Sequence, residues 1–439
     1  MNEYGEGAPA YLTFRVTAQP GPIAAFAEEE AWRARERYPQ IMGMGLPVFH
    51  YTRELDHGGW EILGCGGHAP QDARDLLASY FLRMANACAS DDRTKTGALA
   101  AAERLDWVAL NELRVLGRRY RVVRAEQFIR MGPDGPEPPR PSDPDPARSR
   151  PGEANDIPSR TQGFVLDPYT GTGLSDGLLR FDLSQFVRAR WAAPDEMYID
   201  ARAARRSHPG AVLLPAEFAI AEKSDDGRWL PHSASSSSPQ GARDALASHF
   251  RVYAPVMDGL SAAEREEYAR AADRLDEKRG TGVAVAGRRF RVTRVEQLVR
   301  IGPDGPEPPR PSDHDPYPPP AAQVQQLKAE GRWRDEDTEP EPMTAEQREL
   351  WRLLEKERDR RRSVRREREE RQRRERERGV GRDLGAGLDA ALGAEAHRDL
   401  GTGFDRDFGT GFDRDLEVDL DRDPDTGLGR DPDTAFGTD

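Results

Sequence analysis

The chain has 439 residues, with 78 acidic and 65 basic side chains and a formal net charge of −13. This length allows about two to four domains, and two cysteines are too few for a disulfide framework. The first residues form neither a basic start nor an apolar stretch, and no segment is apolar enough to span a membrane. We therefore expect a cytoplasmic protein without membrane contact.

A thirty-residue segment occurs twice. Residues 117–146 read GRRYRVVRAEQFIRMGPDGPEPPRPSDPDP and residues 287–316 read GRRFRVTRVEQLVRIGPDGPEPPRPSDHDP, with 23 of the 30 positions identical. The similarity extends upstream, because PQDARD at 70–75 returns as PQGARD at 239–244. The sequence therefore predicts two homologous modules, residues 9–131 and residues 162–301.

Each module combines helices with antiparallel strands. Strands are expected at 48–55 and 60–63, and again at 218–222 and 229–230. The helices that start at Pro70 and Pro239 carry apolar residues at helical spacing, and Ser238 is suited to cap the second. A capping box predicts a further helix that begins after Ser261 and ends near Leu275. Residues 115–122 are typical of a hairpin with Gly117 in its turn. The predicted fold class is α+β, as two small tandem modules.

Proline-rich segments follow both modules, at residues 132–161 and 302–342. Proline removes backbone donors and favours extended conformation, so both segments are interpreted as semi-rigid linkers. They contain PxxP, a common pattern in such linkers.

The remainder of the chain has a different character. Residues 343–380 contain almost no glycine or proline, and their apolar residues form no sustained seam, which predicts a solvated, charged single helix supported by i,i+4 pairs. Residues 381–439 contain octads such as DLGTGFDR, with few apolar residues in each. Such a low-complexity segment cannot bury enough surface to fold alone, so the acidic tail is predicted to be disordered.

Two patterns invite a chemical interpretation. His50, His57, Cys65 and His68 lie close together in the sequence, but the second module has no counterpart of this set, so we predict neither a metal nor a cofactor. Residues 173–177 match GxSxG, yet the preceding residues are typical of a loop and not of the buried strand that a nucleophile elbow requires. No catalytic residue is assigned.

Arginines recur in both copies of the repeated segment. The candidates for binding an anion or a partner are Arg119, Arg121, Arg124, Arg289, Arg291 and Arg294. One interpretation is a solvated strand face that deters edge pairing. The other is a platform for phosphate or carboxylate, which guanidinium groups bind in bidentate fashion. The lack of interleaved aromatic residues argues against nucleic acid.

The repeated segment, GFVLDP at residues 163–168, TGLSDG at 172–177 and HPG at 208–210 resemble an uncharacterised actinobacterial family, a domain of unknown function with tandem units. The resemblance covers about residues 10–316. It implies no activity and no catalytic residue.

These observations favour a non-enzymatic interaction or scaffold protein with protein partners. A regulatory or ligand-binding protein for an anionic ligand is the alternative, and an enzyme of unknown class comes third. The acidic tail is also expected to contact the repeated arginines within the chain.

Overall fold

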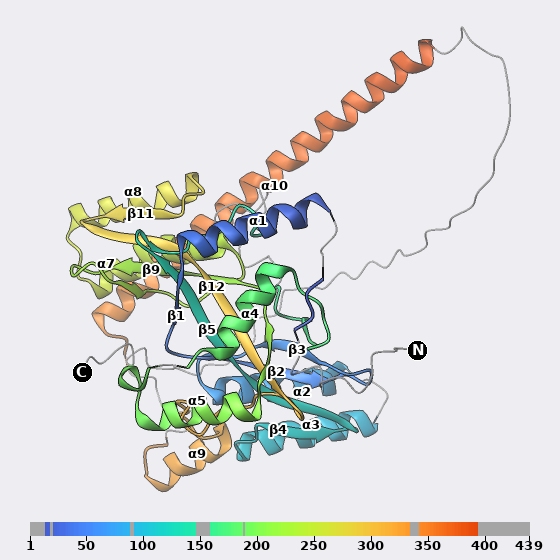
Figure 1. The fold of residues 1–439 in the computed structure, drawn as a ribbon. Helices are drawn as coiled ribbons and strands as arrows, with labels where there is room; N and C mark the ends of the chain where they lie inside the picture. The colour runs from blue at the N-terminus through green and yellow to red at the C-terminus, as the bar shows by residue number, and fades with distance from the viewer. Residues whose placement is uncertain are drawn as a thin grey trace, which may run out of the picture. The chain divides into compact units, whose positions relative to one another are not determined.

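The computed structural model describes residues 14–17, 21–87, 92–145, 159–187, 189–333 and 342–393 (Figure 1). It comprises two compact units, Met1–Arg366 and Glu367–Asp439. The predicted disordered tail lies outside the described residues from residue 394 onward. Within the described ranges, no helix has the length and apolarity that a membrane span needs.

Within the described residues, an antiparallel sheet of 13 strands organises the first unit. Its main path runs β10-β9-β12-β5-β2-β3-β7, and the shorter strands pair with β5 or β12. The strands are β1 (Gln40–Gly43), β2 (Val48–Glu54), β3 (Trp60–Cys65), β4 (Glu112–Val115), β5 (Arg118–Gly132), β6 (Gly135–Pro136), β7 (Val165–Leu166), β8 (Gly210–Leu213), β9 (Glu217–Lys223), β10 (Trp229–Pro231), β11 (Gly282–Val285), β12 (Arg288–Gly302) and β13 (Gly305–Pro306).

The long strands β5 and β12 cross the molecule side by side (Figure 1). Their register runs from Phe128 opposite Glu296 to Ala125 opposite Val299, and Gln127 faces Gln297. Both strands alternate arginines with β-branched and aromatic residues, a composition suited to a pleated surface that packs on one side. They join a first half (residues 21–132) to a second half (residues 159–302).

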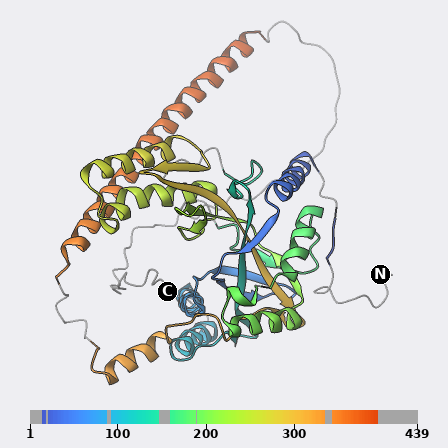
Figure 2. The ribbon, with the colours of Figure 1, turned by 60° about the vertical axis from the view of Figure 1, so that its left-hand side comes forward.

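Helices lie at both ends of the long strands and also beside their crossing (Figures 1 and 2). The helices are α1 (Pro22–Arg37), α2 (Pro70–Ala87), α3 (Asp92–Trp107), α4 (Leu174–Gln185), α5 (Asp195–Ser207), α6 (Pro239–Ser248), α7 (Ala254–Met257), α8 (Ala262–Glu277), α9 (Pro320–Ala329) and α10 (Ala345–Gly393), with a π-helical segment at His249–Tyr253. The helices α2 and α3 pack on the first half, and α6 and α8 on the second.

The two halves have similar aromatic cores. Phe81 on α2 meets Tyr120 on β5 edge to face, with ring centroids 4.9 Å apart. Phe250 meets Phe290 on β12 in the same way at 5.2 Å. Such pairs contribute about 0.5–1.5 kcal/mol each beyond the burial of their area. Each half therefore has its own hydrophobic core under its own helices.

Most of the local predictions are confirmed. The expected strands correspond to β2, β3, β9 and β10, and the hairpin is the β4–β5 turn, in which Gly117 has φ +83°. The Ser238 side chain accepts a hydrogen bond from the Gly241 backbone N–H, and Ser261 forms the predicted capping box. The helix after Ser261 extends to Glu277, two residues beyond the expected end.

The start of α10 differs from the predicted solvated helix. Glu357 is only 6% exposed, because Arg360 and Arg361 pair with it and Arg251 lies 3.9 Å away. Arg360 also pairs with Asp276 on α8 at 3.1 Å. Ion pairs thus attach this helix to the second half, and Leu350, Leu353 and Leu354 on the side of Glu357 are half-buried.

The turn between β11 and β12 generates a stability prediction. Ala286 has φ +47°, a left-handed conformation that costs a residue with a Cβ about 1–2 kcal/mol. We expect Ala286→Gly to raise the free energy of unfolding by about 0.5–1 kcal/mol, measured by urea denaturation. Ala284→Gly, in the neighbouring extended strand, is the control and should lower it.

Candidate functional site

Two proline-rich segments contact the opposite half of the molecule. Arm 1 is residues 133–145 and follows β5; arm 2 is residues 303–315 and follows β12. Each arm turns back through a two-residue strand, β6 or β13. A Cβ added to Gly305 would lie 2.6 Å from Trp60 Nε1, and one added to Gly135 would lie 2.4 Å from Trp229 Nε1. Both glycines have φ near +111°, so only glycine fits this approach.

Buried ion pairs fix the arms in place. The guanidinium of Arg124 on β5 donates to Asp313 of arm 2 at 2.9 Å, and that of Arg294 on β12 donates to Asp143 of arm 1 at 3.1 Å. The backbone N–H groups of the same two arginines donate to arm carbonyls, those of Glu307 and Glu137, both at 2.9 Å. Each contact occurs twice, at positions 170 residues apart.

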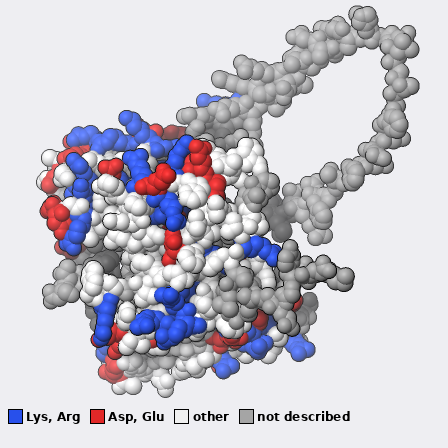
Figure 3. Space-filling model, viewed as in Figure 1, with Lys and Arg blue, Asp and Glu red and all other residues white. Residues whose placement is uncertain are grey.

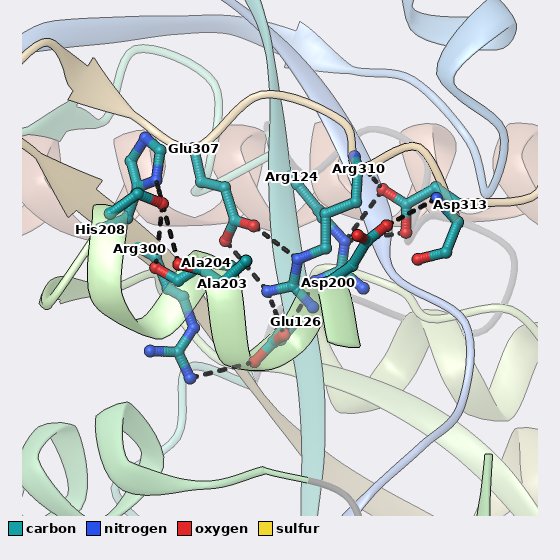
Figure 4. Close-up of polar contacts among 12 residues, drawn as sticks. Arg124, Glu126, Asp200, Ala203, Ala204, His208, Arg300, Glu307, Arg310 and Asp313 are labelled. Atoms are coloured by element: carbon teal, nitrogen blue, oxygen red, sulfur yellow. Dashed lines mark hydrogen bonds and ion pairs between the residues drawn. The ribbon is translucent and has the colours of Figure 1, made fainter. Parts of the chain in front are cut away.

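A second layer of charge surrounds the Arg124 pair (Figure 4). Glu126 accepts from Arg124 at 2.9 Å and from Arg310 of arm 2 at 2.7 Å, and it lies 3.7 Å from Arg300. Burial alone would raise the pKa of Glu126, but the three guanidinium charges outweigh burial and hold its pKa at about 2. The carboxylate is therefore ionised and serves as a structural counter-ion.

The arginine pair at the start of β5 is neutralised internally. Arg119 binds Glu112 through Nε at 2.9 Å and Asp304 at 2.9 Å, and Arg121 binds the same two carboxylates. Both guanidinium groups lie over the ring of Trp60, at 5.2 and 4.9 Å from its centroid. Arg119, Trp60 and Asp304 line a groove of about 480 Å³.

The equivalent pair on β12 has no such carboxylates. Arg291 donates to the Pro136 carbonyl at 3.1 Å and lies over Trp229 at 5.0 Å. Arg289 is exposed, and no hydrogen bond or ion pair of its side chain occurs among the described residues. Of the six predicted arginines, Arg119, Arg121, Arg124 and Arg294 are thus engaged by carboxylates, whereas Arg289 and Arg291 are not.

The sequence suggested either a solvated strand face or an anion-binding platform, whereas four of these arginines form ion pairs with carboxylates of the same chain. Arg121 and Arg124 are only 4% and 5% exposed, so neither side chain is solvated. Sequence reasoning missed the arm partners of the repeated arginines, Asp143, Asp304 and Asp313, because they lie in segments interpreted as linkers. The available signal was that these acids recur at the same 170-residue offset as the arginines.

The other candidate patterns lie apart from the arms. His50 is fully buried, and burial lowers its pKa to about 4. Within the described ranges, no group of three or more His, Cys, Asp or Glu residues is arranged to hold a metal ion. Ser175 lies in the first turn of α4, where its N–H and Oγ both donate to Glu28 at 2.7 Å.

A basic groove runs along α5. It has a volume of about 520 Å³ and is lined by Val187, Ala189, Arg190, Tyr198, Arg202, Arg205 and Arg206. Lys and Arg side chains gather over this helix in the space-filling view (Figure 3). Arg202 lies over the Tyr198 ring, and Arg190 pairs with Asp195. Arg205 and Arg206 make no ion pair with any residue in the described ranges.

The arm contacts predict a strong effect at Arg124. Arg124→Met leaves the buried carboxylate of Asp313, 1% exposed, without its cation, so we expect the free energy of unfolding to fall by about 3–5 kcal/mol in urea denaturation. Arg33→Met breaks an exposed pair with Glu29 and should cost less than about 1 kcal/mol. Equal losses in the two variants would contradict the role assigned to Arg124.

The Glu126 carboxylate predicts an acid dependence. Its pKa is depressed in the folded state, so its contribution is fully present above about pH 4.5, the ordinary glutamate range, and is lost as pH falls towards 2. We expect the free energy of unfolding to decrease less steeply over this window in Glu126→Gln than in the wild type. Glu266→Gln, at an exposed helix position, should keep the wild-type slope.

No curated protein and no solved structure matches the sequence. A family model described as "Family of unknown function (DUF5954)" matches residues 21–316, which contain both halves, both arms and the repeated arginines. The chain belongs to this family of unknown function.

Proposed function

We propose that this chain is a non-enzymatic interaction protein in which two duplicated halves form an internal two-fold pair. The pairing of Gln127 with Gln297, residues 170 positions apart, supports this relation. So does the repetition of each arm contact at the same offset. The arms lock the halves into one rigid platform on which a partner binds.

The groove along α5 carries this proposal, because several guanidinium groups without carboxylate partners among the described residues gather there. Its volume of about 520 Å³ lies within the range of typical ligand pockets. In the first half, α1 has Arg35 at the position of Arg205, and Asp182 of α4 neutralises it at 3.0 Å. Arg205 has no such carboxylate within the described ranges.

A phosphorylated group suits this groove better than a single carboxylate. It carries nearly two negative charges and three strong acceptor oxygens, which several guanidinium groups share. Arg202, Arg205 and Arg206 are exposed on one helix and supply those donors. The adjacent Trp191 is 90% exposed and offers an apolar anchor for a larger partner that carries the phosphate.

The arrangement of titratable groups supports binding over catalysis. The repeated pairs Arg124–Asp313 and Arg294–Asp143 hold the arms, and among the described residues no repeated nucleophile lies beside a base. Ser175 contacts a carboxylate, Glu28, in place of the histidine that usually activates such a serine.

Calorimetric titration with inorganic pyrophosphate tests the groove. The double variant Arg205→Ala/Arg206→Ala should bind pyrophosphate at least tenfold more weakly than the wild type, because charged hydrogen bonds contribute about 1.5–3 kcal/mol each. Arg270→Ala removes an exposed arginine on α8 and should leave the affinity unchanged. Identical affinity in all three proteins would refute the α5 site.

A further inference from the structure

The two halves hold the same arginine pair in two different states. In the first half, Arg121 has three kinds of contact: the Pro306 carbonyl of arm 2 at 2.9 Å, the Trp60 ring, and the Glu112 carboxylate at 2.7 Å. In the second half, Arg291 keeps the first two, with the Pro136 carbonyl and the Trp229 ring. The third contact is absent.

Specific sequence differences explain the absence. Glu112 on β4 lies opposite Arg121, whereas the residue opposite Arg291 on β11 is Gly282. Glu54 of β2 lies 3.5 Å from Arg119, whereas Lys223 of β9 lies opposite Arg289. Compared with the first half, the second half therefore lacks the carboxylates of Glu112 and Glu54 at these positions and has the additional cation of Lys223.

The arm acid is also placed differently. Asp304 of arm 2 binds both Arg119 and Arg121. Its counterpart Asp134 of arm 1 is paired with Arg37 instead, at 3.4 Å, and its side chain is 68% exposed. Among the residues that the structure describes, no carboxylate therefore pairs with Arg289 or Arg291.

These residues share one face of the sheet. Trp229 pairs across the strands with Lys223, and Lys223 with Arg289, so all three side chains project to the same side. Arg291 follows two positions along the same strand and projects to that side as well. The patch holds three cations and an indole, and Arg291 is already oriented by its ring and carbonyl contacts.

We propose that this patch, defined by Lys223, Trp229, Arg289 and Arg291, binds an acidic peptide segment that presents two carboxylates to the arginine pair. The first half shows the occupied form of the same site, since two peptide side chains, Glu112 and Asp304, fill it there. The bidentate contacts of Glu112 with Arg119, through Nε at 2.9 Å and Nη2 at 3.1 Å, define the geometry that the bound carboxylate adopts. The contacts of Glu112 and Asp304 in the first half thus indicate that the partner of the second half is an acidic peptide.

This site is separate from the α5 groove and does not depend on the proposed function. At the position of the α5 groove, the first half offers one neutralised arginine, Arg35 with Asp182, whereas at the position of the patch it offers two carboxylates that bind both arginines. A planar carboxylate matches the fork of one guanidinium group, and a neighbouring acidic side chain of the same peptide supplies the carboxylate for the other guanidinium group. Pyrophosphate and an acidic peptide therefore distinguish the two sites.

Calorimetric titration of the full chain with a hexaglutamate peptide tests the patch. Arg289→Ala should weaken binding at least tenfold. Gly282→Glu, which restores the carboxylate found in the first half, should weaken it by a similar factor because the patch becomes internally neutralised. Its added Cβ would lie 3.1 Å from the Phe290 carbonyl oxygen, so Gly282→Ala serves as the control for this tight contact and should keep wild-type affinity.

Two further variants separate this site from general charge attraction. Arg228→Ala removes an exposed arginine of the same half and should leave peptide affinity unchanged. Arg205→Ala/Arg206→Ala should also leave it unchanged. Unaltered binding in Arg289→Ala and Gly282→Glu overturns the proposal, as does an equal loss in Arg228→Ala. Loss only in the α5 double variant would also overturn it, while leaving the proposed function intact.

Discussion

The exchange of arms between the two halves is the contact on which the rest of the structure depends. The long strands β5 and β12 pair directly at only four positions, from Phe128–Glu296 to Ala125–Val299. Each arm extends this junction by laying its carbonyl groups and carboxylates along the strand of the opposite half. Removing a buried arginine costs more than its pair contributes, because the remaining acid is left uncompensated.

Proline is well suited to such an arm. A buried segment must satisfy every backbone donor, and proline has none to satisfy. The carbonyl oxygens of Pro136 and Pro306 instead accept hydrogen bonds from Arg291 and Arg121. The same feature made the segments appear as linkers in the sequence, since missing donors also favour an extended, unpaired chain. Composition alone does not distinguish a solvated linker from an arm that needs only acceptors.

Local structure followed from the sequence more readily than tertiary contacts did. The turn at Gly117 and the caps at Ser238 and Ser261 depend on neighbouring residues, so short patterns predict them. The pairing of Arg124 with Asp313 spans 189 residues, and no local pattern indicates which half an arm joins. The contacts at the start of α10 were similarly missed, because the partners of Glu357 include Arg251 from another helix. The repeat identified the important arginines, but their neutralisation required the structure.

The binding that we propose for the second half rests on the unequal neutralisation of the equivalent arginines in the two halves. Hydrogen exchange at the Arg124 and Arg294 amides tests the underlying lock most directly, since their N–H groups donate to the arm carbonyls of Glu307 and Glu137. If the arms are integral to the fold, both amides exchange only through global unfolding, at the rate of the most protected neighbours in β5 and β12. Exchange of these two amides far ahead of their neighbours would show that the arms detach in the native state and would contradict the account.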